Sequence, residues 1–75
     1  MFESAMGSLD EALSKHKQHF SLIYDTIKRA SSANGSLVVI LLLYRNDVAK
    51  KGSAPFQLLN HYLAHCITQF VRSQN

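Results

Sequence analysis

The sequence predicts an all-α protein, an antiparallel bundle or hairpin of three helices at roughly residues 8–32, 36–51 and 55–72. Apolar residues recur at spacings of three and four in the first and last of these segments, which is the period of a helix with one buried face. Two short breaks rich in Ser, Gly and Pro separate the segments. The hydrophobic content of 47% and the charged content of 17% exclude a disordered chain, and 75 residues make a single small domain.

The first predicted helix begins with a capping signal. Ser8 and Glu11 have the spacing of a capping box, in which each side chain accepts a hydrogen bond from the backbone N–H of the other residue. We therefore expect residues 1–7, like residues 73–75, to be frayed. Behind the cap, apolar residues form a seam with alternating spacings of four and three. The seam consists of Leu9, Leu13, His16, Phe20, Ile23, Ile27 and Ala30. Asn34 or Gly35 is expected to end this helix in the left-handed conformation.

The middle segment is ambiguous by local criteria. Residues 37–44 are eight apolar or aromatic residues in a row, and the β-branched residues among them favour a strand. Two observations favour a helix beginning after Ser36. The segment continues without a break to Lys50, Lys51 and Gly52, a typical helix end. No second strand is available for pairing, and a lone strand is not stable.

A helix that is apolar on every side must be covered on every side. A domain of this size buries only about 60% of its unfolded surface, and two flanking helices do not surround a third. We therefore expect a homodimer in which the middle helix and the seam of the first helix form the interface. The expected interface residues are His16, Phe20, Ile23, Ile27, Val38, Val39, Ile40, Leu41, Leu42 and Leu43.

The third predicted helix follows Ser53 or Ala54 as its cap, with Pro55 in the first turn, where its missing N–H costs nothing. Its apolar residues again alternate between spacings of three and four. This buried stripe is expected to contain Phe56, Leu59, Leu63, Cys66 and Phe70.

The four histidines raise the question of a metal site. His61 and His65 are four residues apart on one helical face, a spacing at which two imidazoles can share a Zn²⁺ ion. However, Cys66 lies nearly opposite them and no carboxylate accompanies them, so we expect solvated side chains and predict no metal or cofactor. His16 lies within the apolar seam. We interpret it as a core histidine or a polar residue that fixes the register, in preference to a pH-sensitive contact.

Catalysis is not expected. The chain has five carboxylates and no Gly-rich phosphate loop, and Cys66 falls in a buried stripe. A single cysteine forms no internal disulfide, and no signal peptide is visible, so we expect a cytoplasmic protein. The apolar run is far shorter than the ~20 residues that span a bilayer, and no membrane partner is expected.

The sequence therefore predicts a non-enzymatic interaction module, a homodimer that binds another protein as a regulator, inhibitor or chaperone. The alternative is a small basic DNA-binding regulator, because the net charge is +3 and three short helices are compatible with a helix-turn-helix variant. Against the alternative, Asp10, Glu11 and Asp25 are interleaved with the cations of the first helix. The cations Lys50 and Lys51 end a helix, where the helix dipole is sufficient to explain them.

Overall fold

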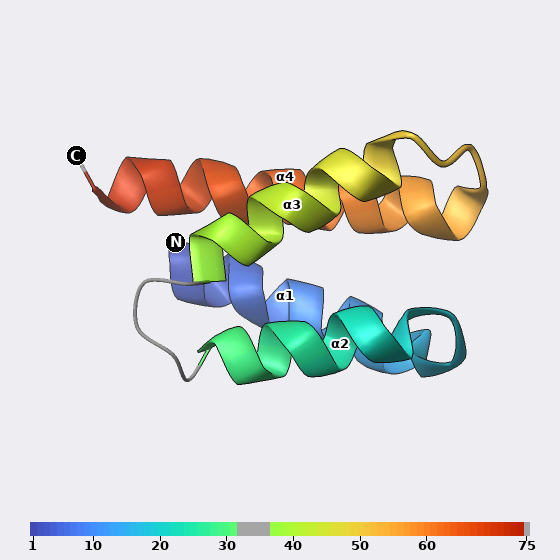
Figure 1. The fold of residues 1–75 in the computed structure, drawn as a ribbon. Helices are drawn as coiled ribbons and strands as arrows, with labels where there is room; N and C mark the ends of the chain where they lie inside the picture. The colour runs from blue at the N-terminus through green and yellow to red at the C-terminus, as the bar shows by residue number, and fades with distance from the viewer. Residues whose placement is uncertain (32–36, 75) are drawn as a thin grey trace.

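The computed structural model describes residues 1–31 and 37–74, which form a bundle of four α-helices (Figure 1). The helices are α1 (Phe2–Lys15), α2 (Lys17–Ser31), α3 (Leu37–Ala49) and α4 (Ala54–Ser73). Successive helices run in opposite directions, and the contacts join α1 to α2, α2 to α3, α3 to α4 and α4 back to α1. The described residues thus form a closed ring of helices without a strand. The all-α prediction is confirmed, and the number of three helices is wrong.

The extra helix arises because the chain reverses at residues 16–20. His16 and Phe20 leave helical geometry, with φ/ψ of −118°/37° and −123°/27°. The backbone N–H groups of His19 and Phe20 both donate to the carbonyl oxygen of His16, at 2.9 and 3.0 Å. These bonds hold a tight corner that contains neither Gly nor Pro. The sequence therefore has no helix-breaking residue from which the corner could be predicted. The seam residues Leu13 and Phe20 on either side of the corner are both buried, so the apolar pattern is satisfied by a hairpin as well as by one long helix.

Helix α1 begins at Phe2, and two predictions for this region are therefore wrong. Residues 2–7 are helical, with Ala5 only 2% exposed, where we expected a frayed tail. The ring of Phe2 packs edge-on against Phe70, with 5.4 Å between centroids, and Met1 donates from its amino group to Gln69 Oε1 at 3.0 Å. Because this packing extends the helix toward the N-terminus, Ser8 and Glu11 lie in mid-helix on the exposed side and form no capping box.

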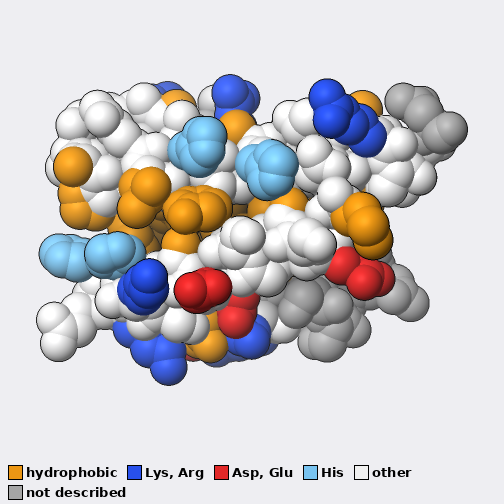
Figure 2. Space-filling view, turned by 180° about the vertical axis from the view of Figure 1, so that it is seen from behind, with side chains coloured by type: hydrophobic (Ala, Val, Ile, Leu, Met, Phe, Trp, Pro, Cys, Tyr) orange, Lys and Arg blue, Asp and Glu red, His pale blue; other side chains and the backbone are white. Residues whose placement is uncertain are grey.

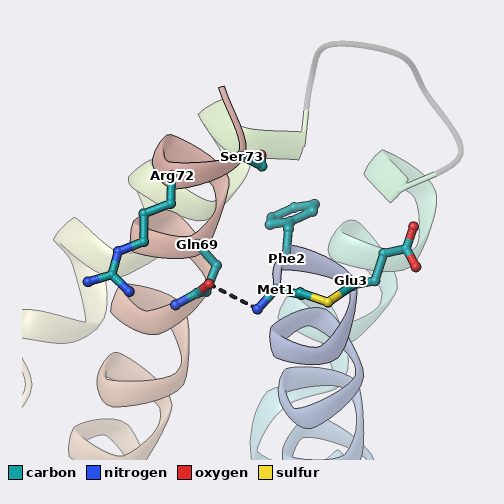
Figure 3. Close-up of a pocket in the computed structure, with 6 residues that line it drawn as sticks. All are labelled: Met1, Phe2, Glu3, Gln69, Arg72 and Ser73. Atoms are coloured by element: carbon teal, nitrogen blue, oxygen red, sulfur yellow. Dashed lines mark hydrogen bonds between the residues drawn. The ribbon is translucent and has the colours of Figure 1, made fainter. Parts of the chain in front are cut away.

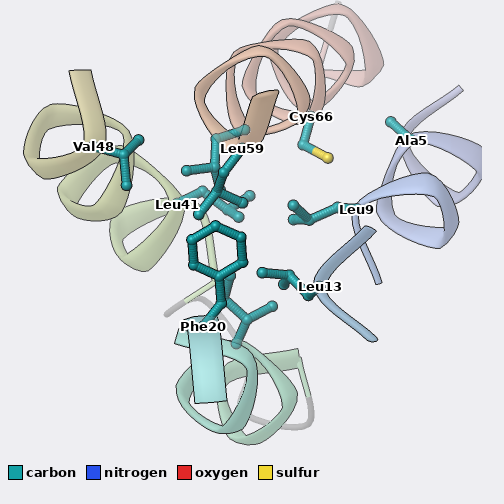
Figure 4. Close-up of a cluster of buried hydrophobic side chains, with 10 residues drawn as sticks. Ala5, Leu9, Leu13, Phe20, Leu41, Val48, Leu59 and Cys66 are labelled. Carbon is teal, nitrogen blue, oxygen red and sulfur yellow. The ribbon is translucent and has the colours of Figure 1, made fainter. Parts of the chain in front are cut away.

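The core lies along the axis of the ring and draws on all four helices (Figure 4). On α4 the predicted stripe is confirmed, because Leu59, Leu63 and Cys66 are buried while its two phenylalanines are half-buried. The ring of Phe20 meets that of Phe56 edge-on at 5.2 Å, which joins the corner to the first turn of α4. The buried residues of the core are Ala5, Leu9, Leu13, Phe20, Ile27, Leu41, Val48, Leu59, Leu63 and Cys66.

The remaining helix ends agree closely with the sequence. The middle segment is helical, as predicted, and α3 ends at Ala49. Helix α4 has Ser53 as its N-cap residue and Pro55 in its first turn. The expected stop at Asn34 or Gly35 and the expected cap at Ser36 lie outside the described residues.

Two substitutions in α1 distinguish this helix from a frayed tail followed by a cap. Ser8→Ala should leave the free energy of unfolding unchanged or raise it by up to about 0.5 kcal/mol, because alanine is the better residue in mid-helix. Loss of a true cap would lower it by about 1 kcal/mol. Ala5→Asp should lower it by at least about 2 kcal/mol, because it places a carboxylate in the core. Urea unfolding followed by circular dichroism measures both, and a neutral Ala5→Asp would contradict the packing of α1.

Candidate functional site

The outer face of α3 carries three large apolar side chains that no other helix covers. Val39, Leu42 and Leu43 are 53%, 49% and 58% exposed. Their spacings of three and one place them on one side of the helix, whereas Leu41 and Val48 point from the other side into the core. We call Val39, Leu42 and Leu43 the outer stripe. It exists because α3 is apolar around its whole circumference while α2 and α4 cover only its flanks and inner side.

The structure divides the ten expected interface residues into three groups. Phe20, Ile27 and Leu41 are buried in the chain's own core, so as packed they offer no surface to a second chain. Four others are half-buried, among them His16, which ends α1 at the corner and does not sit in a continuous seam. The half-buried residues are His16, Ile23, Val38 and Ile40. Only the outer stripe remains openly exposed.

Other large apolar residues of the described chain are exposed singly. Leu22 on α2 is 73% exposed, Val71 and Leu58 on α4 are 55% and 45% exposed, and Met1 is exposed at the N-terminus. Leu22, Leu58 and Val71 lie outside the apolar seams of their helices, and this position in the sequence is the signal by which their exposure could have been predicted.

The charges of the chain are distributed unevenly around the ring. Residues 17–53, which contain α2 and α3, carry six of the eight Lys and Arg residues but only two of the five carboxylates. Several of these cations lie over aromatic rings. Lys17 and Lys28 place their ammonium groups 5.1 and 5.5 Å from the Tyr24 centroid, and Lys51 lies 5.3 Å from that of Phe56. The α2–α3 half of the molecule is therefore basic.

One ion pair joins α1 to α2. Lys28 Nζ lies 3.0 Å from Asp10 Oδ1, and this contact raises the pKa of Lys28 through its hydrogen bond and charge interaction with Asp10. Both side chains are about half exposed, so the pair is screened by solvent and contributes little to stability.

Surface hollows occur at the end of the bundle and between helices. One of about 490 Å³ lies where the first turn of α1 meets the last turns of α4 (Figure 3). The Phe2 ring lies in it, while the side chains of Glu3 and Arg72 point away to opposite sides, so its charged groups do not converge. Another, of about 250 Å³, lies between α1 and α4 and is lined by Lys15, Leu58 and Tyr62 among others. The lining of this second hollow also includes Ser8, Glu11 and His16.

The histidines are distributed over one face of the molecule. Figure 2 shows histidine side chains on α4 and at the corner of α1 and α2, on either side of an apolar strip. His61 and His65 are exposed on α4, and Cys66 is buried on its inner side, as the sequence predicted. Among the described residues, no group of three or more His, Cys, Asp or Glu side chains is placed to hold a metal ion.

No protein family, curated protein or solved structure matches this chain. None of the described helices combines the length and the apolar character needed to cross a membrane.

Burial makes Cys66 a slow nucleophile. Loss of solvent raises the pKa of its thiol from 9.0 to about 11, because the charged thiolate is disfavoured inside the core. At pH 8 only about one thiol in a thousand is then ionised, against about one in ten in the unfolded chain. We expect a disulfide reagent to modify the native protein at least about 100-fold more slowly than the protein in urea. Equally fast modification in both states would show that α4 opens readily.

Proposed function

We propose that the chain is a non-enzymatic protein-interaction module that uses the outer stripe of α3 to associate with a second copy and with another protein, as a regulator, inhibitor or chaperone. The observation that supports this proposal is the exposure of Val39, Leu42 and Leu43, each about half or more, on one side of one helix. Exposed apolar side chains that lie together on a surface are typical of contact sites, whereas single ones are not.

The size of the outer stripe sets the strength of association. Full burial of a Leu or Val side chain contributes about 1.5–3 kcal/mol, so three half-exposed side chains contribute about 3 kcal/mol on each copy and about 6 kcal/mol when two stripes cover each other. A micromolar Kd requires about 8 kcal/mol. The stripe alone thus supports only weak self-association, and a partner protein binds more tightly if it also contacts the flanking polar residues Arg45, Asn46 and Lys50. A single chain already has a core of its own that draws on all four helices.

Leu43→Glu tests the outer stripe, with Leu22→Glu as a matched control. Both leucines are exposed on helices, so neither change removes core packing. We expect wild-type protein to self-associate between about 10 μM and about 1 mM in sedimentation equilibrium. Leu43→Glu should weaken this association at least about tenfold, because a carboxylate cannot be buried against a leucine without a large cost. Leu22→Glu should leave it unchanged.

Circular dichroism and urea unfolding establish that both variants remain folded. A wild-type protein that is monomeric throughout this range would contradict self-association through α3. Equal weakening by the two variants would place the contact elsewhere.

A second candidate function is nucleic-acid binding, and the observation that favours it is the basic character of the α2–α3 half. Phosphate contacts by Lys and Arg release counterions, so affinity that depends on them falls steeply with salt. Association through the outer stripe is driven by burial of apolar surface and is far less sensitive to salt.

Replacing Lys50 and Lys51 together with glutamine separates the two candidates. Both side chains are exposed at the end of α3. If the outer stripe is the contact site, the Kd for self-association of the double variant should lie within about threefold of the wild-type value. The wild-type protein should then bind duplex DNA with a Kd weaker than about 1 μM at physiological salt. Tighter duplex binding that the double change abolishes would favour the nucleic-acid function.

A further inference from the structure

Helix α4 holds two imidazoles in a fixed relation. His61 and His65 lie four residues apart within a helix that runs from Ala54 to Ser73. Residues at this spacing are neighbours on the helix surface, with Cβ atoms roughly 5–6 Å apart. Because α4 packs against both α1 and α3 and its inner side is buried, the backbone that carries the pair is held by the core.

Neither imidazole is engaged elsewhere. Both side chains are exposed, and within residues 1–31 and 37–74 neither one has a hydrogen-bond or ion-pair partner. The His61 ring lies edge-on against the ring of Tyr62, with 6.0 Å between centroids. Residues 54–73 contain no Lys, Asp or Glu, so no charged neighbour on α4 short of Arg72 competes for the ring nitrogens. Figure 2 shows the histidine side chains of α4 lying open on the surface.

We infer that His61 and His65 together chelate one divalent transition-metal ion of borderline softness, namely Zn²⁺, Ni²⁺ or Cu²⁺. Each histidine provides one ring nitrogen, and water completes the coordination. Imidazole is a preferred ligand of these ions, and two imidazoles held on one helix bind more tightly than one because the second bond forms within the same molecule. A buried structural zinc site would need a third and fourth ligand, whereas an open surface chelate does not.

The other histidine pair provides an internal contrast. His16 and His19 are three residues apart, but His16 has non-helical φ/ψ and the corner lies between α1 and α2. His16 is half-buried, and the rings of His16 and His19 both lie against the Phe20 ring, at 6.1 and 6.2 Å between centroids, so we expect this pair to bind a metal ion more weakly than the open pair on α4. His19 is exposed, which makes His19→Ala a control that removes one imidazole without removing core packing.

The test is titration with Zn²⁺ alone, in competition with a chromophoric chelator. Wild-type protein should bind one ion, and His61→Ala and His65→Ala should each lower the affinity at least about tenfold, because each leaves a single ligand. His19→Ala should leave it unchanged. In a parallel NMR titration, paramagnetic Ni²⁺ should broaden the amide signals of residues 58–68 first.

A register variant makes the result specific to the spacing. His65→Ala combined with Thr68→His keeps four histidines but places the α4 pair seven residues apart, about 10 Å along the axis, too far to share one ion. It should bind Zn²⁺ as weakly as His65→Ala. Wild-type affinity in the register variant, an equal loss in His19→Ala, or broadening centred on the corner of α1 and α2 would each overturn the inference. None of these results depends on whether α3 mediates association.

Discussion

The reversal of the chain at residues 16–20 determines the rest of the architecture. Because His16 accepts two backbone hydrogen bonds and Phe20 leaves helical geometry, α2 returns alongside α1 and does not extend it. The Phe20 ring then meets Phe56 at the start of α4, which helps to close the four helices into a ring. Within this ring α3 is covered on its inner side and flanks but not on its outer side. The exposed stripe on α3 thus follows from the way the corner between α1 and α2 arranges the helices around it.

The parts of the fold that could be predicted from the sequence are those with both a period and a boundary signal. In α4, Pro55 marks the start and the spacing of Leu59, Leu63 and Cys66 gives the buried side, and the structure agrees with both. The two wrong predictions for the first segment arose where the boundary signal was misleading or absent. Ser8 and Glu11 match a capping motif locally, but packing of Phe2 and Ala5 against α4 extends the helix through it. The corner lacks glycine and proline, and an apolar seam retains the same spacing whether the helix is straight or folded back.

The candidate site was only partly predictable for a related reason. A helix that is apolar all round has no recognisable apolar stripe. Its sequence therefore does not reveal which residues face a neighbouring helix. The prediction that α3 has uncovered apolar surface was sound, but Leu41 could not be distinguished from Leu42 or Leu43 until the positions of α2 and α4 were known. The histidine pair of α4 differs, because its spacing is visible in the sequence. The structure agrees with the expected exposure of both side chains and adds that neither has a hydrogen-bond or ion-pair partner among the described residues.

The closure of the ring also has a kinetic consequence. Three of the four helix contacts join helices adjacent in the chain, whereas the contact between α1 and α4 joins segments that are far apart, with Met1 and Gln69 separated by 68 positions. Contacts between distant segments carry the greatest loop-closure entropy, which slows their formation. We therefore expect the sequential hairpins to form early and the docking of α1 on α4 to limit the folding rate.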